Sequence, residues 1–278
     1  ILRKVHDDGT AELIDWPQLQ AYAYDLVFGN YQPKTEHDYS RFAKILNKKY
    51  SYMPSKCDLN YAYKRLIRER LLADRRNNVY GANYRNIVLE RSLQAKKIRK
   101  LSGVSVATVL TSGEEGFEGD NGGCKFNCHY CPWEKTPKAP RDMPRSYLSK
   151  EPAVARANAN DFDPFMQIID RFSVTVLNGG YPDKGEIIVE GGTIGSYKKD
   201  YLIEFHRELY RAFNLFYTPE GERRTGKFTL QGEQLTNETA MCRVIGLTLE
   251  TRPDCINPEQ IMLFRELGCT RVQIGVQH

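Results

Sequence analysis

The chain has 278 residues, 41% of them hydrophobic, with 7 Cys, 17 Tyr and 12 Phe. At roughly 100 to 200 residues per domain, this length predicts one large domain and a smaller one. No apolar run approaches the roughly 20 residues that cross a membrane, and an odd number of Cys is not a secreted disulfide framework. The composition therefore excludes both classes and favours a cytoplasmic protein without a membrane partner.

The positive charge of the chain, a net of +5, is concentrated in its N-terminal part. Residues 1–102 hold 20 Lys and Arg against 11 Asp and Glu, a net of +9, whereas residues 103–278 carry a net of −4. Within Arg41–Lys100, 17 basic residues face 4 acidic ones, and apolar residues recur at helical intervals. We expect residues 1–102 to form a small, basic, all-helical region.

This basic region has two interpretations. Lys-rich helices often have a solvated outer face without a ligand. A net charge of +13 over Arg41–Lys100 instead favours a polyanion, because phosphate neutralisation releases counterions. Interleaved tyrosines can stack on unpaired bases, which favours RNA over duplex DNA. These tyrosines are Tyr50, Tyr52, Tyr61, Tyr63, Tyr80 and Tyr84.

Beyond Lys100, short apolar runs alternate with helical patterns. Consecutive β-branched and apolar residues predict strands that are covered on both faces, as in a parallel sheet. The predicted strands are residues 103–110, 186–192, 244–252 and 271–278. Helical periodicity covers Phe165–Val176 and Leu202–Phe213 between them.

The last predicted helix has the clearest boundaries. Asn257 is its expected N-cap, Pro258 its first residue, Gln260 completes a spacing like that of a capping box, and Gly268 ends it. In contrast, the segment Gly226–Thr236 is interpreted as an additional short strand without a definite place.

Polar and glycine residues follow each predicted strand directly. A cysteine loop follows the first strand, Gly191–Thr193 the second, Glu250–Arg252 ends the third, and Gln277–His278 ends the fourth. The carboxyl ends of the strands carry the active site of a (β/α) barrel. We therefore expect an α/β fold over residues 103–278, a partial barrel truncated at its C-terminus, since four strands cannot close one.

Three Cys of one short loop form a cluster. They are Cys124, Cys128 and Cys131. A structural zinc site needs a fourth ligand, which would have to come from His129 or from a distant thiol such as Cys255 or Cys269. A four-iron cluster held by three Cys instead leaves one iron open for chemistry. Gly122–Gly123 would let the backbone wrap closely around such a cluster.

The CxxxCxxC spacing, with Tyr130 before the last Cys, resembles that of radical S-adenosylmethionine enzymes. In that superfamily, S-adenosylmethionine binds the open iron, and its reductive cleavage gives the 5′-deoxyadenosyl radical. The resemblance implies a [4Fe-4S] cluster on the three Cys. The expected cofactor-binding residues are Tyr130, Gly191, Gly192, Thr193, Glu250 and Arg252. A strand-end Gly pair is also an ordinary turn, and Glu250 with Arg252 could equally be a structural ion pair.

Longer motifs resemble the radical S-adenosylmethionine half of the Elongator catalytic subunit family. They are "SGVSVATVLTS", "SYLSKEPAVARANANDFDP", "EIIVEGGTIGS", "NETAMCRVIGLTLETRPD" and "LGCTRVQIGVQH". That family forms the carboxymethyl group at C5 of the wobble uridine of tRNA, with acetyl-CoA as carbon source. The resemblance implies that Lys184 contacts acetyl-CoA, although a solvated turn lysine is the alternative. It also implies a homodimer or Elongator-type subunits, and an acetyltransferase domain beyond His278.

The basic N-terminal region resembles the tRNA-binding part of that family. The cations expected to contact tRNA are Lys48, Lys49, Lys64, Arg65, Arg68, Arg75, Arg76, Lys96, Lys97, Arg99 and Lys100. Arg156 either meets a phosphate or caps a loop. The chain departs from the family in the three-residue spacing of its first two Cys, in "CPWE" after Tyr130, and in the acidic, Gly-rich Ser112–Gly123.

Three hypotheses follow. The first is a tRNA-modifying radical enzyme that works as an acyltransferase. The second is a tRNA-binding iron–sulfur protein whose cluster is not catalytic. The third is a radical S-adenosylmethionine enzyme with a small-molecule substrate, which the basic N-terminal region disfavours.

Overall fold

The chain forms two compact units in a computed structural model. The described residues are 3–5, 11–13, 16–77, 79, 83–94, 102–117, 122–136, 138–139, 141–178, 180–218, 223–226 and 228–276. The first unit comprises Ile1–Leu101 and Thr175–Tyr181, and the second comprises Ser102–Val174 and Pro182–His278. In the described part of the chain, no helix is long and apolar enough to cross a membrane.

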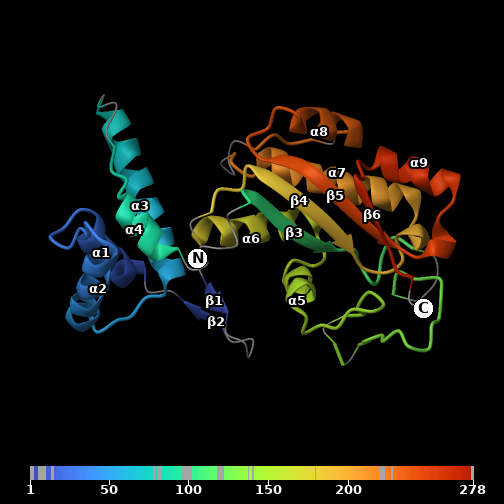
Figure 1. The fold of residues 1–278 in the computed structure, drawn as a ribbon, viewed down its shortest axis with the longest axis horizontal. Coiled ribbons are helices and arrows are strands. Elements are labelled where there is room, and N and C mark those ends of the chain that lie inside the picture. Colours follow the sequence, from blue (N-terminus) through green and yellow to red (C-terminus); the bar gives the residue numbers. More distant parts are fainter. Residues whose placement is uncertain are drawn as a thin grey trace. The chain divides into compact units, whose positions relative to one another are not determined.

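The first unit is mainly helical (Figure 1). Its elements are β1 (Arg3–Val5), β2 (Ala11–Leu13), α1 (Trp16–Val27), α2 (Glu36–Tyr50), α3 (Lys56–Arg76) and α4 (Ile87–Leu93). The strands pair antiparallel, so the expectation of an all-helical region was wrong for this short hairpin. Three residues per strand are too few to show an alternating pattern. The N-terminus of α2 is a capping box, in which Thr35 and Asp38 each accept from the other's backbone N–H.

The second unit contains the expected parallel sheet. Its strands are β3 (Val104–Leu110), β4 (Lys184–Glu190), β5 (Arg243–Thr251) and β6 (Arg271–Ile274). They lie side by side in sequence order, and every neighbouring pair is parallel. The described fold therefore confirms the predicted α/β class, with strand and helix alternating as in a partial (β/α) barrel.

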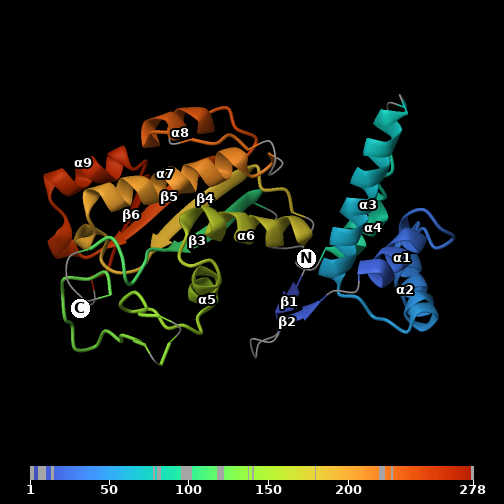
Figure 2. The ribbon, with the colours of Figure 1, turned by 180° about the vertical axis from the view of Figure 1, so that it is seen from behind.

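Helices cover one face of this sheet (Figures 1 and 2). They are α6 (Pro164–Leu177), α7 (Lys199–Leu215), α8 (Leu230–Asn237) and α9 (Pro258–Glu266). Ile187 and Leu247 of the sheet belong to one buried cluster with Phe172 of α6 and Phe213 of α7. The two Phe rings meet edge to face at 4.9 Å. A Cβ on Gly185 would lie 2.2 Å from the Phe213 ring, so this glycine permits the helix to pack closely on β4.

Side chains of α5 (Pro152–Ala159) and α6 cover the open edge of β3. The amide of Gln167 accepts from Leu110 N at 2.9 Å and donates to Leu110 O at 3.0 Å, as a neighbouring strand would. Arg171 donates to Val106 O at 3.1 Å. Arg156 donates to Thr108 O at 2.5 Å, so it caps a strand edge, which neither predicted role anticipated.

Two segment predictions had opposite outcomes. The capping pattern of α9 is confirmed, because the Asn257 side chain accepts from Gln260 N at 2.8 Å and Gly268 has a φ of 88°. The strand predicted over Gly226–Thr236 was wrong. This segment contains the start of α8, where Thr229 accepts from the backbone N–H three residues later.

Candidate active site at the cysteine loop

A cavity of about 360 Å³ lies at the carboxyl ends of β4 and β5. Its walls come from the cysteine loop after β3, from the loop after β4 and from the end of β5. The lining residues are Cys124, Cys128, Tyr130, Cys131, Arg145, Ser146, Tyr147, Gly191, Gly192, Thr193, Glu250, Thr251, Arg252, Pro253, Asp254, Gly275 and Val276. The fold thus brings all three Cys and all six expected cofactor-binding residues to one cavity.

Glycines allow the cysteine loop to pack onto the end of β4. Gly123 has a φ of 72°, and a Cβ there would lie 1.9 Å from the Tyr197 hydroxyl. A Cβ on Gly192 would lie 1.9 Å from the carbonyl oxygen of Gly123. Because this second neighbour is backbone, no rotamer change could relieve the clash. Gly192 therefore has a packing role in the described structure, and its predicted approach to a cofactor stays a prediction.

Each thiol of the cluster has a polar neighbour. Cys124 Sγ lies 3.1 Å from the Thr193 hydroxyl, Cys131 Sγ lies 3.2 Å from the Ser146 hydroxyl, and Cys128 Sγ lies 3.0 Å from Arg252 Nη1. All three cysteines are free of disulfides. Three thiols that face one cavity can therefore serve as ligands.

The donor set fits an iron–sulfur cluster. Among the described residues, no three His, Cys, Asp or Glu side chains lie close enough to share one metal ion. A cluster does not require such convergence, because it binds each Cys at a separate iron atom. Of the fourth ligands considered for zinc, Cys269 bonds to Arg271 O at the start of β6, and His129 is exposed. Cys255 is buried near Cys124 but does not line the cavity.

Two carboxylates and a phenol lie at or next to this cavity: Tyr147 and Glu250 line it, and Glu190 directly precedes Gly191. Tyr147 donates a hydrogen bond to Glu250 at 3.1 Å. Burial, with the Glu250 and Glu151 carboxylates, raises the pKa of Glu190. Burial and the same Glu250 charge raise the pKa of the Tyr147 phenol. The cavity thus holds acidic groups that a cationic ligand would stabilise.

The guanidinium of Arg252 is engaged by neighbouring side chains. Its Nε and Nη2 donate to the two oxygens of Asp254 at 2.9 and 2.7 Å, and its Nη1 donates to Cys128 Sγ at 3.0 Å. It also lies 3.8 Å from the centre of the Phe126 ring. The hydrogen bond from Arg252 lowers the pKa of Asp254. Contact between Arg252 and a cofactor carboxylate remains a prediction.

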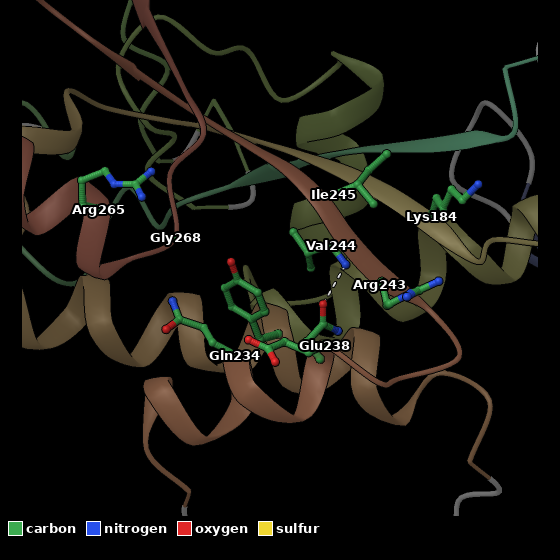
Figure 3. A pocket seen from close by; sticks show the side chains of 10 residues that line it. Lys184, Gln234, Glu238, Arg243, Val244, Ile245, Arg265 and Gly268 are labelled. Carbon is green, nitrogen blue, oxygen red and sulfur yellow. Dashed lines mark hydrogen bonds between the residues drawn. The ribbon is translucent and has the colours of Figure 1, made fainter.

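Lys184 lies apart from the cysteine cavity. It begins β4 and lines a second cavity of about 380 Å³ with Tyr210, Gln234, Glu238 and Arg243, among others. Figure 3 shows the Lys184 and Arg243 side chains extending away from Gln234 and Glu238. The seven residues to Gly191 correspond to roughly 23 Å of strand. Any contact of Lys184 with acetyl-CoA would therefore occur far from the thiols.

The cations expected to bind tRNA are only partly described. Lys48 and Arg76 are exposed, and Lys64 is half-buried. Two others have anionic partners: Lys49 pairs with Asp25 at 2.6 Å, and Arg65 pairs with Glu69 at 2.8 Å. Outside the described residues lie Lys96, Lys97, Arg99 and Lys100, and the side chains of Arg68 and Arg75.

The tyrosines of the basic region are partly internal. Tyr63 is 2% exposed and donates to Glu90 at 2.8 Å, so it cannot stack on a base. Tyr50 donates to Asp25 at 2.9 Å, and Tyr84 packs against the same core as Tyr63. The prediction that these rings stack on RNA was therefore wrong for Tyr63. Tyr80 lies outside the described residues.

Sequence reasoning missed several groups at the cavity. Tyr147, Ser146 and Asp254 line it, and Glu190 lies beside it at the end of β4. Glu190 could have been found, since it directly precedes the Gly pair at a predicted strand end. The other three lie within the longer motifs quoted above, but no spacing or strand-end position singled them out as site residues.

Known proteins resemble this chain over most of its length. It is 33% identical to the tRNA uridine(34) acetyltransferase of Methanocaldococcus infernus over 198 residues, which are 71% of this chain and 34% of that protein. It is 31% identical to Elongator complex protein 3 of Homo sapiens, over 70% of this chain and 33% of that protein. The chain thus spans about a third of the length of the curated relatives it matches.

A solved structure is also similar. The archaeal Methanocaldococcus infernus Elp3 with an N-terminal deletion aligns with a TM-score of 0.42 and 27% identity, over 63% of this chain and 29% of that one. No protein-family model matches the chain.

Proposed function

Because the chain belongs to the family of the tRNA uridine(34) acetyltransferases and Elongator complex protein 3, we propose that it acts on the wobble uridine of tRNA. In this proposal it is the radical S-adenosylmethionine part of an acyltransferase that forms the carboxymethyl group at C5 from acetyl-CoA. The observation that carries the proposal is the single cavity that three free Cys share with Glu250 and Arg252 at the strand ends.

The residues of the cavity have distinct roles in this proposal. Cys124, Cys128 and Cys131 would hold a [4Fe-4S] cluster. With S-adenosylmethionine bound, that cluster supplies the radical chemistry that activates the acetyl methyl group. Glu250, which already accepts a hydrogen bond from Tyr147, would also accept one from the ammonium group of the cofactor, because a carboxylate and a cation form a strong charge-assisted hydrogen bond. The wall formed by Gly191 and Gly192 would exclude water from one side.

Basic residues of the first unit would hold the tRNA. Phosphate contacts position a nucleic acid without reading its sequence, so Lys48 and Arg76, both exposed, would set affinity more than specificity. If several such cations bind phosphates, the affinity should fall steeply with salt. The logarithm of the binding constant should fall with the logarithm of the salt concentration with a slope of roughly −0.7 per phosphate contact on single-stranded RNA. Either a second copy of the chain or Elongator-type subunits would assist as partners.

The second candidate is a tRNA-binding iron–sulfur protein with a non-catalytic cluster. One observation favours it: the Arg252 guanidinium already bonds to Asp254 and Cys128, so it is engaged within the protein and not directed at a cofactor carboxylate. Such a protein would bind tRNA and a cluster without cleaving S-adenosylmethionine.

Anaerobic reconstitution with iron counting tests the proposal. We expect about four iron atoms per chain, as a single four-iron cluster requires, and 5′-deoxyadenosine on addition of S-adenosylmethionine and a reductant. Stimulation of that cleavage by tRNA separates the proposed enzyme from one with a small-molecule substrate. Zinc held by four protein ligands would refute the proposal, and a cluster without cleavage would favour the second candidate.

A further inference from the structure

We propose that Arg252 is a positioning residue that holds Cys128 toward the cavity. Its Nη1 donates to Cys128 Sγ at 3.0 Å, across 124 residues of sequence. The inference rests on the proposed function in one respect, namely that Cys128 is a cluster ligand. The contact between Arg252 and the Cys128 thiol does not depend on a bound cluster.

Two further contacts fix the orientation of this guanidinium. Asp254 accepts from Nε and Nη2, which makes a bidentate pair, and the centre of the Phe126 ring lies 3.8 Å from the guanidinium carbon. A planar guanidinium that a bidentate partner and an aromatic ring already hold loses little conformational entropy when it forms one more hydrogen bond. The remaining nitrogen, Nη1, is thereby directed at the sulfur. Phe126 lies two residues from Cys128, so Arg252 contacts the cysteine loop at two points.

Cys128 differs from the other two thiols in its surroundings. Cys124 and Cys131 each lie beside an aliphatic hydroxyl group, whereas Cys128 has a charged donor in addition to the Tyr130 phenol. Cys128 is also flanked by the exposed residues Asn127 and His129. A charge-assisted hydrogen bond is roughly twice as strong as a neutral one, so it suits the least enclosed part of the loop.

This contact has two consequences. Before any cluster is present, it should restrain the loop segment around Cys128. Once a cluster is bound, an N–H donor to a ligand sulfur changes the reduction potential, because the cationic donor stabilises the more negative, reduced state. Loss of the donor should therefore shift the midpoint potential to a more negative value.

Arg252→Lys and Arg252→Gln in the full chain test the proposal. Lys keeps the charge without the planar fork, and Gln removes the charge. In the metal-free protein, hydrogen exchange of the peptide covering residues 125–132 should become about tenfold faster in both variants. After anaerobic reconstitution, the midpoint potential should become more negative, with the larger shift for Arg252→Gln. Arg271→Lys is the matched control, because Arg271 pairs with Glu186 at 2.7 Å in the same sheet and does not line the cysteine cavity.

The outcomes separate clearly. If both variants are folded and match the wild-type protein in loop exchange and in potential, the positioning role is refuted. If either Arg252 variant fails to fold, Asp254→Asn decides, because it leaves Arg252 in place and removes the charge and one of the two acceptor oxygens of its bidentate partner. Faster loop exchange in Asp254→Asn supports the role, and unchanged exchange refutes it. If the wild-type protein takes up no iron, the proposed function fails while the exchange measurement still tests Arg252.

Discussion

The helical unit and the sheet unit use their polar side chains in different ways. In the helical unit, tyrosine hydroxyls are bonded to carboxylates at the edge of the core, as in Tyr50 with Asp25 and Tyr63 with Glu90. In the sheet unit, polar groups from distant segments gather around one cavity at the strand ends. A polar aromatic residue in a basic helical segment is therefore weak evidence for a ligand, whereas polar residues after successive parallel strands are strong evidence.

The largest effect is expected from removing one thiol of the sheet unit. Cys128→Ala should abolish assembly of the four-iron cluster and any cleavage of S-adenosylmethionine, while tRNA binding, assigned to the helical unit, stays unchanged. Iron analysis and a tRNA filter-binding assay measure the two properties. Cys269→Ala is the control, because this buried thiol lies two residues before β6 and does not line the cysteine cavity. A Cys128→Ala protein that keeps its cluster and cleavage activity would show that the ligand assignment is wrong.

The next effect concerns the packing of the cysteine loop. Gly192→Ala should destabilise the protein by about 1–3 kcal/mol, because its Cβ would overlap the Gly123 carbonyl and the loops would have to separate. Urea denaturation measures the free energy of unfolding. Gly195→Ala is the matched control, since a Cβ there meets its nearest neighbour, Cys255 Cβ, at 3.4 Å. Equal stability of the two variants would contradict the close packing described here.

A loss of comparable size is expected in the core of the helical unit. Tyr63→Phe should cost about 1–3 kcal/mol, because it removes the hydrogen bond to Glu90 and leaves Asn86 N, which donates to the Tyr63 hydroxyl at 2.8 Å, without that acceptor. Thermal denaturation gives the loss. Tyr24→Phe, at a side chain that is 53% exposed, should change stability by less than about 0.5 kcal/mol. A Tyr63→Phe protein with unchanged stability would show that the two hydrogen bonds of this hydroxyl do not stabilise the fold.

The smallest effects concern the pH dependence of stability, which should differ between a carboxylate of the helical unit, Glu90, and one of the sheet unit, Glu190. The hydrogen bond from Arg85 lowers the pKa of Glu90, and burial raises that of Glu190. Ionised Glu90 therefore stabilises the fold above its unfolded pKa of about 4.3, and this is lost as the pH falls through its folded value. Ionised Glu190 destabilises the fold above its raised pKa, and the penalty disappears as the pH falls below about 4.3.

Neutral variants of the two carboxylates check these signs. At pH 7, Glu90→Gln should lower the melting temperature and Glu190→Gln should raise it. Both differences should shrink in acid, that of Glu190→Gln first, because its folded pKa is the higher of the two. Melting curves recorded from pH 7 to pH 3 measure them. A loss of stability in Glu190→Gln at pH 7 would mean that its carboxylate has a cationic partner.

The sheet could be predicted from the sequence because consecutive apolar residues mark β3, β4 and β5. The expectation that every strand is covered on both faces was wrong, since all four residues of β6 are exposed. The hairpin of β1 and β2 could not be predicted, since each strand has three residues. The segment around α8 was misassigned because its apolar residues are few, although Thr229 and the polar residues after it carry an N-cap signal. In short elements, caps are better guides than periodicity.

The candidate site was predictable where its residues are close in sequence. Cys124, Cys128 and Cys131 follow one spacing, and the Gly pair ends a predicted strand. The contacts of Arg252 with Cys128 and of Tyr147 with Glu250 join residues more than a hundred positions apart. Only the fold brings such pairs together, so no local pattern could indicate them.

The side chains that cover the outer edge of β3 make the two edges of the sheet different. Because Gln167, Arg171 and Arg156 occupy the polar groups of Leu110, Val106 and Thr108, a strand from another molecule cannot register there without displacing them. Addition of a strand is thus confined to the opposite side of the sheet, which β6 and the first residues of β5 form. One border is sealed by its own helices, which protects the protein from edge-to-edge self-association on that side.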